Sequence, residues 1–386
     1  MKTFRSLFLM LIFATAQTLA AQNPWIQPIV QSVSGDSIFA TIADLQPMDR
    51  VNANNSMVPA NYLKQRLQAY RMDTVFFQYF KPNTPPNVVA IRYGTVQPNE
   101  YWVMGGHYDA VVPGAGADDN ASGTAAVIEM ARVINDYELE KSLILVLFSA
   151  EEVGLWGSKA FVDSAVNHFN IAGMINLDMI AYSHALADSS VSVCWRYFCA
   201  GLMQDYLTAT GIYVPELEVD QDSVSVVLYA SDHAPFWAKM IPALFLIENS
   251  DRFGGAFNPY YHQFSDTIGL GANSKWLAEK ITRSAIAALM VITKPFSTIS
   301  IPVDRPDLTG ISVYPNPAST NVTVTGIPGV DHGSHLYILD CTGKMLYHQS
   351  QLQNGSVIDI SQLPSGIYFM QFIDYQGSEV KKLIIR

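Results

Sequence analysis

Five short clusters rich in histidine and acidic residues have the residue types needed for metal chemistry. They supply five candidate metal ligands: His107 in GGHYDAV, Asp119 in ADDNASG, Glu152 in SAEEVGLWGS, Asp178 in NLDM and His262 in YHQFSDT. Zinc binds imidazole nitrogens and carboxylate oxygens, and a catalytic zinc leaves one position open for water. Two metal ions about 3.5 to 4 Å apart need one bridging carboxylate and separate terminal ligands. The clusters therefore predict a two-metal hydrolase, in which Glu151 is left over as a base.

Short apolar runs precede most of these clusters and predict the strands that position them. Strands are expected over 87–94, 101–107, 142–150, 172–179 and 241–248, and helices over 26–47, 58–70, 120–135 and 274–292. Strands that alternate with helices predict an α/β fold with a mostly parallel (mixed) sheet sandwiched by helices. Ligands of such sheets bind just beyond the carboxyl ends of the strands, where His107, Glu151, Glu152 and Asp178 fall.

Each candidate also has an ordinary structural alternative. A histidine near an aspartate is common in loops, but His107 and Asp109 are two apart on an extended chain end and point the same way, so Asp109 can orient the imidazole. The cluster around Asp119 can also cap the helix that follows it. Asp178 lies among apolar neighbours, where an unpaired charge is costly unless a cation is near. A lone histidine such as His262 is more often structural, so its assignment depends on the other four ligands.

Composition excludes some classes of partner and indicates export. The 386 residues carry a formal net charge of −11, so we expect no nucleic acid and no anionic lipid partner. Lys2 and Arg5 precede an apolar run that ends in small residues near Ala21, which is the pattern of a secretory signal peptide over 1–21. The run is short for a membrane span, and no stable span is expected after its removal.

A second, smaller domain is expected after the catalytic domain, which covers 22–295. Residues 296–308 contain prolines and no clear periodicity, and they predict a linker. Short alternating strands over 309–386 then predict a small all-β sandwich. The three cysteines, Cys194, Cys199 and Cys341, give no disulfide framework, and both a Cys194–Cys199 disulfide and two buried thiols stay open.

The ordered clusters, together with SDHAPF at 231–236, resemble a known family over about residues 25–295. This is metallopeptidase family 28, the bacterial leucyl aminopeptidase type of co-catalytic zinc peptidases. The resemblance implies a zinc peptidase domain over 22–295 with two Zn²⁺ per chain. One zinc would be held by His107 and Asp178 and the other by Glu152 and His262, with Asp119 as the bridge.

The same resemblance assigns roles in catalysis. Glu151 matches the family's general base, and Tyr229, just before SDHAPF, is a candidate hydrogen-bond donor to the oxyanion. A carboxylate-rich site suits a protonated or metal-bound amine, whereas a carboxypeptidase would need a cationic clamp. Five residues could line an apolar pocket for the first side chain: Met179, Phe245, Ile247, Phe257 and Tyr261. We therefore expect a secreted aminopeptidase for neutral, hydrophobic N-terminal residues, with a carboxypeptidase or dipeptidase as an alternative.

Two further alternatives stay open. Glutaminyl cyclases resemble the same fold, but as the resemblance implies they work with a single zinc and depart from the DDNASG and EE patterns, which are intact here. In addition, Tyr261 stands before His262 where a tryptophan is often found in those enzymes. A noncatalytic binding module of this fold would show the loss of a ligand, and none is lost.

The C-terminal region has a resemblance of its own. The segments VYPNPAS, LYILDCTGKMLY, IDISQLPSGIYFMQF and KKLIIR are similar to the C-terminal sorting domain of type IX secretion, over roughly 309–386. An ordinary immunoglobulin-like adhesion module is the alternative. The resemblance implies export through the periplasm by the type IX machinery, and a secreted or cell-surface protein.

Overall fold

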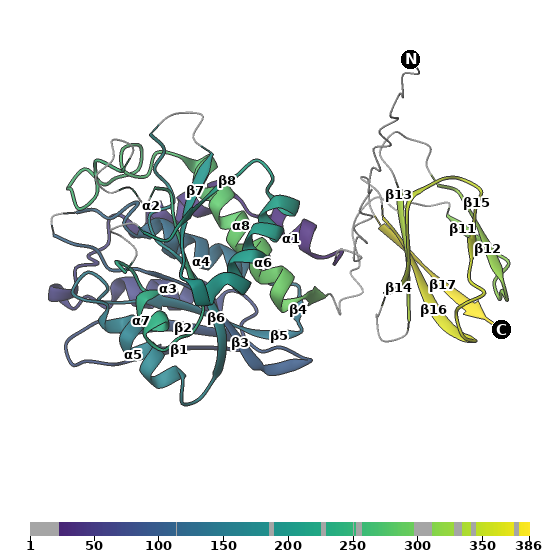
Figure 1. The fold of residues 1–386 in the computed structure, drawn as a ribbon, viewed down its shortest axis with the longest axis horizontal. Coiled ribbons are helices and arrows are strands. Elements are labelled where there is room, and N and C mark those ends of the chain that lie inside the picture. Colours follow the sequence, from purple (N-terminus) through teal and green to yellow (C-terminus); the bar gives the residue numbers. More distant parts are fainter. Residues whose placement is uncertain are drawn as a thin grey trace, which may run out of the picture. The chain divides into compact units, whose positions relative to one another are not determined.

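The computed structural model describes residues 23–112, 114–184, 189–224, 229–249, 251, 257–296, 311–327, 334–340, 345–373 and 378–386. The chain forms two compact units, a larger one, Asn23–Ile299, and a smaller one that holds Ser300–Arg386 (Figure 1). The predicted signal peptide, Cys341 and residues 297–308 of the predicted linker lie outside the described residues. Within the described residues, no helix has the length and hydropathy needed to span a membrane.

An eight-stranded sheet forms the centre of the larger unit, as far as the chain is described, in the order β1-β2-β5-β3-β6-β9-β7-β8. The four central strands are parallel neighbours: β5 (Lys141–Phe148), β3 (Gln97–His107), β6 (Asn170–Leu177) and β9 (Ala243–Ile247). The antiparallel pairings lie outside them, among β1 (Thr74–Gln78), β2 (Asn87–Arg92) and β5, and between β9 and β7 (Ser190–Cys194). β8 (Glu218–Asp222) is parallel to β7 at the edge. The predicted fold class, a mixed sheet between helices, is confirmed.

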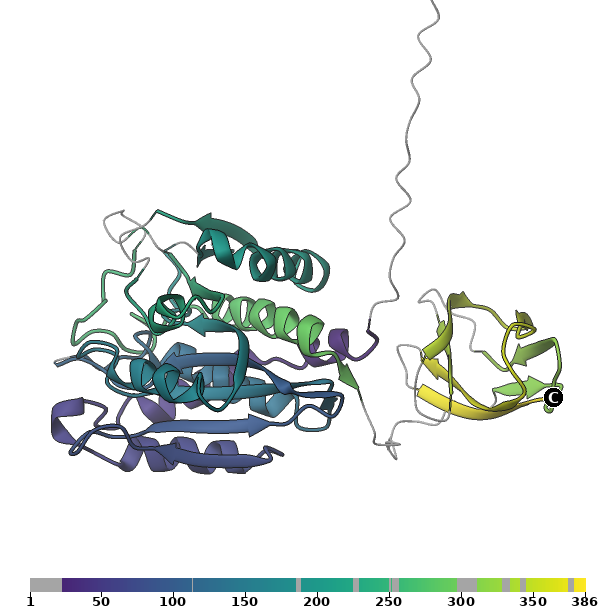
Figure 2. The ribbon, with the colours of Figure 1, turned by 60° about the horizontal axis from the view of Figure 1, so that its bottom comes forward.

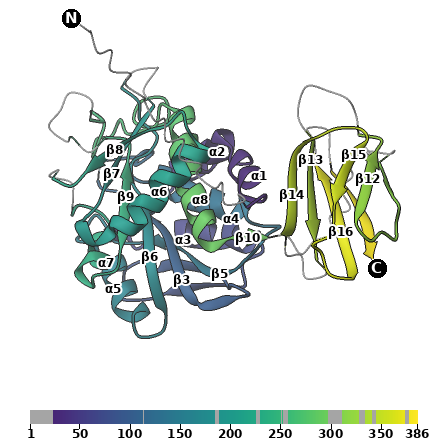
Figure 3. The same ribbon diagram turned by 45° about the vertical axis from the view of Figure 1, so that its right-hand side comes forward.

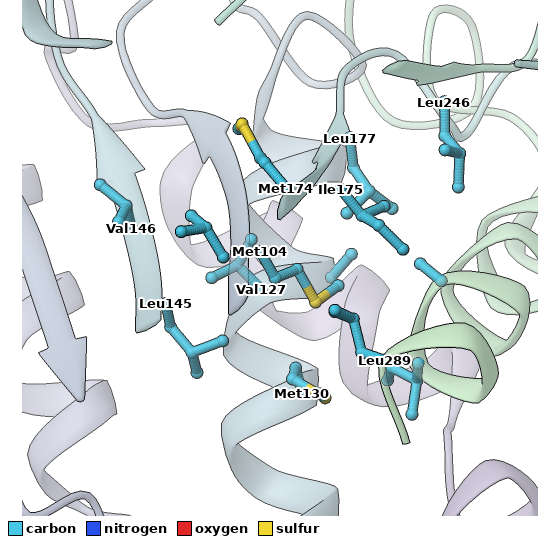
Figure 4. Close-up of a cluster of buried hydrophobic side chains, with 14 of the residues drawn as sticks. Met104, Val127, Met130, Leu145, Val146, Met174, Ile175, Leu177, Leu246 and Leu289 are labelled. Atoms are coloured by element: carbon cyan, nitrogen blue, oxygen red, sulfur yellow. The ribbon is translucent and has the colours of Figure 1, made fainter. Parts of the chain in front are cut away.

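Helices cover both faces of this sheet (Figure 2). α4 (Ala121–Val133) and α8 (Lys275–Thr293) pack on one face, where Met130 of α4 and Leu289 of α8 belong to the same buried apolar cluster as Leu145 of β5 (Figure 4). α5 (Trp156–Ala165) and α7 (Ala234–Ala238) lie on the other face, since the ring of Phe161 lies 5.8 Å from that of Phe148 and 6.1 Å from that of Phe236. Leu145 and Phe148 are an odd number of residues apart on one strand, so their side chains point to opposite faces.

The remaining elements complete the larger unit. They are α1 (Ile26–Gln31), α2 (Gly35–Leu45), η1 (Asn52–Asn54), α3 (Val58–Gln68), η2 (Tyr197–Cys199), α6 (Ala200–Tyr213) and the short pair β4 (Glu138–Leu139) and β10 (Pro295–Phe296). Cys194 and Cys199 are buried free thiols, so the disulfide that the sequence left open does not form.

One predicted helix, 26–47, is wrong as a single element, because α1 and α2 are separated by three residues. Ser34 has an extended backbone and caps α2 by accepting the N–H of Ser37 at 3.3 Å. The next residue, Gly35, approaches α8 so closely that a Cβ there would lie 2.8 Å from the carbonyl oxygen of Lys275. The chain therefore turns at Ser34 to bring two short helices onto α8.

The described residues of the smaller unit form two antiparallel sheets (Figure 3). One contains β11 (Ser312–Tyr314), β12 (Asn321–Thr325) and β15 (Ser356–Asp359), and the other β14 (Met345–Leu352), β13 (Ser334–Leu339), β16 (Gly366–Ile373) and β17 (Ser378–Ile385). Val322 and Ile358 from the first sheet share one apolar core with Ile338, Met370 and Leu383 from the second. This is the all-β arrangement expected after the catalytic domain.

Candidate metal centre

The carboxyl ends of the central strands bring the predicted metal ligands together. His107 is the last residue of β3, Asp178 follows β6 directly, and Glu152 lies in the loop after β5. His107 Nε2 lies 3.3 Å from Asp178 Oδ1 and 3.4 Å from Asp119 Oδ1. His262 comes from the loop between β9 and α8, and its Nε2 lies 3.2 Å from both Glu152 Oε2 and Asp119 Oδ2. All five side chains meet in one place, with Asp119 between the two imidazoles.

The start of α4 fixes the position of Asp119. Asn120 caps the helix, since its Oδ1 accepts the N–H of Gly123 at 2.8 Å while its Nδ2 donates to the carbonyl oxygen of Leu177 at 2.9 Å. Gly123 has to be glycine here, because a Cβ would lie 2.2 Å from that Leu177 oxygen. Asp266 accepts the backbone N–H of Asp119 at 3.0 Å. The capping role falls on Asn120, which leaves the Asp119 carboxylate to face the site.

Three residues without the freedom of glycine have positive φ angles beside the site. They are Ala150 (61°), which precedes Glu151, Met179 (57°), which follows Asp178, and His262 itself (58°). This backbone conformation is unfavourable for residues with a Cβ and persists only where surrounding contacts hold it. The loops that carry the site residues are therefore held by specific contacts.

Asp109 lies behind the site and accepts hydrogen bonds from several directions. Its Oδ1 accepts the backbone N–H of Glu151, and its Oδ2 that of Glu152, both at 3.2 Å. Asn52 Nδ2 also donates to Oδ2, at 2.5 Å. His107 Nδ1 lies 3.5 Å from Asp109 Oδ1 and 3.2 Å from the Asp109 carbonyl oxygen. The predicted contact between Asp109 and the imidazole is thus present, together with two contacts to the glutamate loop that the sequence did not indicate.

Asp178 is oriented by neighbours from another part of the chain. Ser231 Oγ donates to Asp178 Oδ2 at 2.7 Å and accepts from Asn176 Nδ2 at 2.8 Å. Ser231 is the first residue of the SDHAPF segment and is fully buried. These bonds leave Asp178 Oδ1 directed at His107.

Burial and opposite charges act against each other on the imidazoles. Burial is the largest single effect and disfavours the charged form of His107, but the carboxylates around the ring, Asp178 and Glu151 foremost, together outweigh it and raise the pKa of His107 well above its usual value. Burial also disfavours a proton on His262, while contacts with Asp119 and Glu152 raise its pKa to about 9. Against the effect of burial, the two imidazoles hold the pKa of Asp119 well below its usual range. A metal ion that binds here must therefore displace protons from the imidazoles.

The glutamates respond mainly to burial. Burial raises the pKa of Glu151 well above its usual value, with His107 opposing and the carboxylates of Asp232 and Asp178 adding to the shift. Burial likewise raises the pKa of Glu152 to about 7. Several carboxyl groups thus lie close together in one buried place, where their negative charges are unfavourable. A divalent cation bound among them would offset this cost.

The donor set fits divalent metal ions. Each of the three candidate carboxylate ligands has one buried oxygen that accepts no hydrogen bond: Asp119 Oδ2, Glu152 Oε1 and Asp178 Oδ1. Within the described part of the chain, two groups of side chains have ligand atoms close enough to hold an ion. One consists of His107, Glu151 and Asp178, and the other of His107, Asp119 and Glu152. The distances of 3.2 to 3.4 Å between imidazole nitrogens and carboxylate oxygens match the edge of a zinc tetrahedron, about 3.3 Å for ligands about 2.0 to 2.1 Å from the metal.

A small pocket of about 60 Å³ opens onto this group. On its apolar side it is lined by Ala230 and by the five residues expected to form a side-chain pocket, Met179, Phe245, Ile247, Phe257 and Tyr261. On its polar side it is lined by His107, Asp119, Glu151, Glu152 and Asp178. Among the described residues that line it, none is a lysine or an arginine. The pocket lining thus combines carboxylate and imidazole groups with apolar and aromatic side chains.

Tyr229 is placed differently from the other candidates. It precedes Ala230, which lines the pocket, but its own side chain is 55% exposed and its ring packs on Trp237 at 5.4 Å. The guanidinium group of Arg196 also lies over the ring of Tyr229, 5.5 Å from its centroid. The assignment of Tyr229 as an oxyanion donor therefore stays a prediction.

Several buried polar residues that support the site carried no assigned role at the level of sequence. Asp266 belongs to the YHQFSDT cluster and Ser231 to SDHAPF, so motif context pointed to their surroundings, though not to their contacts. Arg50 and Asn52 lie in a stretch with no motif or periodicity. Asp232 is fully buried, and burial raises its pKa to about 7 against the effect of His107. Contacts formed between distant segments cannot be read from such short patterns.

The fold and these motifs define a class. The chain belongs to peptidase family M28, whose family model matches residues 87–288, just over half of its length. A second family model, the secretion system C-terminal sorting domain, matches residues 312–386. Both resemblances found in the sequence are confirmed, and so is the prediction that the chain is an enzyme.

Curated relatives match with moderate identity. Leupeptin-inactivating enzyme 1 of Streptomyces exfoliatus is 28% identical over 346 residues, which cover 82% of this chain and 74% of that protein. A probable zinc metalloprotease of Pyrenophora tritici-repentis is 29% identical over 209 residues (46% and 48%), and aminopeptidase YwaD of Bacillus subtilis is 27% identical over 259 residues (62% and 49%). The chain spans about half the length of the latter two relatives.

Solved structures share the fold of the larger unit. The LapA aminopeptidase of Legionella pneumophila has a TM-score of 0.61 at 23% identity, covering 69% of this chain and 74% of that one. A glutaminyl cyclase of Bacteroides thetaiotaomicron has a TM-score of 0.54 at 18% identity, covering 66% and 97%. These similarities establish the fold alone, and the reaction has to be inferred from the residues of the site.

Proposed function

We propose that this chain is a secreted aminopeptidase that uses two zinc ions to remove neutral, hydrophobic residues from the amino ends of peptides. One observation carries the proposal. Asp119 directs one carboxylate oxygen to each imidazole, at 3.4 Å to His107 and 3.2 Å to His262. A carboxylate in this position can bridge two ions, with Asp178 and Glu152 as the terminal carboxylates on either side.

The chemistry divides between the ions and Glu151. Zinc bound at these residues would polarise the scissile carbonyl and supply a water of lowered pKa. Glu151 lines the same pocket and is not needed as a ligand in this arrangement. Its carboxylate would take a proton from the water and return it to the leaving amine. A carboxyl group whose pKa is raised by burial is suited to gain and lose a proton within one turnover.

The pocket favours the amino end of a peptide. Its polar side presents four carboxylates, which attract a protonated amine, and no lysine or arginine is among the described residues that line it. A substrate carboxylate would therefore find no lysine or arginine side chain among the described residues there to hold it. The apolar side suits an uncharged first side chain. These features favour an aminopeptidase over a carboxypeptidase.

Glutaminyl cyclase is the second candidate, because a cyclase and a leucine aminopeptidase precursor, both from Bacteroides thetaiotaomicron, match this fold equally well, with TM-scores of 0.54. The two reactions have different products. A cyclase releases ammonia and leaves the peptide the same length, whereas a peptidase releases a free amino acid. The peptidase is favoured because ligands for two metal ions are present on either side of Asp119. One side has His107 and Asp178, and the other has His262 and Glu152.

The sorting domain supports export. We propose that the smaller unit directs the chain through the type IX machinery, after a signal peptide over 1–21 has taken it into the periplasm. The mature enzyme would then act outside the cell or at its surface.

Initial rates on a panel of aminoacyl anilides, an N-acetylated peptide and an N-terminal glutamine peptide test the proposal, with zinc counted on the same sample. We expect two zinc ions per chain, fastest release from leucine-type substrates and no cleavage of the N-acetylated peptide. Equal cleavage of acetylated and free peptides would overturn the aminopeptidase assignment. In the same assay Tyr229→Phe should lower kcat with little change in KM, and an unchanged kcat would remove Tyr229 from the site.

A further inference from the structure

A short segment between α2 and α3 runs behind the site and joins two of its loops. This segment, residues 49–55, is called the strap below. Asn52, which is 9% exposed, donates from Nδ2 to Asp109 Oδ2 at 2.5 Å and accepts at Oδ1 from Ser149 Oγ at 3.1 Å. Because a carboxamide has one donating and one accepting end, the two bonds fix its orientation. The strap thereby connects the chain after β3 to the chain after β5.

Asp109 passes this constraint on to the site. The same carboxylate accepts the backbone N–H groups of Glu151 and Glu152 at 3.2 Å and lies 3.5 Å from His107 Nδ1. Asn52 therefore fixes a group that touches three candidate functional residues, although it does not line the pocket itself.

Arg50 fastens the strap to the loop after β3. Its guanidinium group is buried and donates to the carbonyl oxygens of Tyr108 at 3.2 Å, Ala115 at 2.6 Å and Gly116 at 2.8 Å. In return, the N–H of Ala110 donates to the carbonyl oxygen of Arg50 at 3.2 Å. The strap is thus a fixed part of the site's support, and Asn52 is its contact with the glutamate loop.

We infer that Asn52 is a positioning residue, which holds Asp109 so that His107, Glu151 and Glu152 keep the arrangement needed for metal binding and proton transfer. The glutamate loop needs such support, because Ala150 has a φ of 61°. Without the carboxamide, Asp109 Oδ2 loses a donor and the Ser149 hydroxyl group loses its acceptor. This inference rests on the proposed function, since it concerns the same site.

Four variants separate a hydrogen-bonding role from simple packing. Asn52→Ala removes the carboxamide, and Asn52→Asp keeps its shape but turns an acceptor toward the Asp109 carboxylate. Ser149→Ala removes the hydroxyl group that donates to Asn52 Oδ1 and leaves Asn52 itself unchanged. Asn54→Asp is the matched control, because Asn54 lies in the same strap and its side chain donates to exposed Asp49. The substitution places the same added charge two residues away from Asn52.

Zinc affinity by competition with a chromophoric chelator, kcat, KM and thermal midpoint are measured for each variant. We expect Asn52→Ala to lower zinc affinity or kcat by about 10- to 100-fold with KM nearly unchanged. Asn52→Asp should be worse than Asn52→Ala, Ser149→Ala milder, and Asn54→Asp within about twofold of the parent.

The outcomes are separable. The inference is overturned if Asn52→Asp matches the parent, or if the Asn52 variants lower only the thermal midpoint. If the Asn52 variants do not fold, the zinc affinity and kcat of Ser149→Ala provide the test. If both values equal those of the parent enzyme, the inference is overturned. Failure of the proposed function would instead appear in the parent, as absent zinc binding or absent aminopeptidase activity.

Discussion

The two units of this chain use their interiors differently. In the larger unit, ionisable side chains are buried at one edge of the sheet, among them His107, Asp109, Asp119, Asp178, Asp232 and Asp266. In the smaller unit, the described buried residues are all apolar, and Val322, Ile338 and Met370 are examples. A buried charge lowers stability unless partners compensate for it. The first interior therefore places reactive groups at a cost in stability, whereas the second only holds two sheets together.

The backbone shows the same contrast. Beside the candidate metal centre, positive φ angles occur at Ala150, Met179 and His262, all of which carry a Cβ. In the described part of the smaller unit, positive φ angles occur at Gly326 and Gly355, where they cost little. Backbone strain and buried charge thus coincide in the larger unit. We therefore expect substitutions at its candidate metal centre to affect zinc binding and turnover, and substitutions in the smaller unit to leave both unchanged.

The largest expected effect comes from the residue between the imidazoles. Asp119→Ala removes the carboxylate that both histidines contact, so zinc should be lost and activity should fall by more than about a thousandfold, equivalent to several kcal/mol. Zinc content and kcat/KM on the purified variant measure this. Asp359→Ala is the control from an exposed position in the smaller unit and should match the parent. Full zinc content in Asp119→Ala would contradict the bridging role.

Glu151→Gln should separate proton transfer from metal binding. The amide keeps the shape of the side chain but cannot act as a base, so kcat should fall by about 10² to 10⁴-fold. Zinc content should stay at the parental level, because Asp119, Glu152 and Asp178 remain. A near-normal kcat would exclude Glu151 as the base, and a loss of zinc would make it a ligand.

Proton displacement should make zinc binding depend on pH. His262 has a pKa of about 9 in the folded protein, raised from an ordinary value of 6.5, so it is protonated below pH 9. Zinc must release this proton, and apparent affinity should therefore rise about tenfold per pH unit from 6.5 to 9 for each proton displaced. Chelator competition across this range measures the slope. His262→Gln should lower the slope by one proton, and a flat profile in the parent would exclude the displacement.

Much of the larger unit follows from local patterns. Apolar runs such as 142–150 predicted β5, and the residues that follow such runs predicted where His107, Glu152 and Asp178 would meet. This works because parallel strands end at one edge of a sheet. The break at Ser34 was missed, because it depends on the close approach of Gly35 to α8, which no single helix pattern contains.

The support of the site was less accessible to sequence reasoning. Arg50 and Asn52 sit in an irregular stretch, and their partners are 57 to 97 residues away along the chain. Asp266 accepts the N–H groups of Asp118 and Asp119 from 148 and 147 residues away. Such hydrogen bonds follow from the tertiary fold and have no local periodicity, so a single sequence identifies ligands more readily than the groups behind them.

The smallest expected effect on catalysis is that of removing the smaller unit. Because buried charge and strain lie in the larger unit, deletion of 309–386 should change zinc content and kcat/KM by less than about twofold. The same deletion should trap active enzyme in the periplasm if the sorting domain directs export. Activity assays on periplasmic and extracellular fractions measure both effects. Unchanged export would refute the sorting role. A large loss of activity in the retained enzyme would show that catalysis depends on the smaller unit as well as on the larger one.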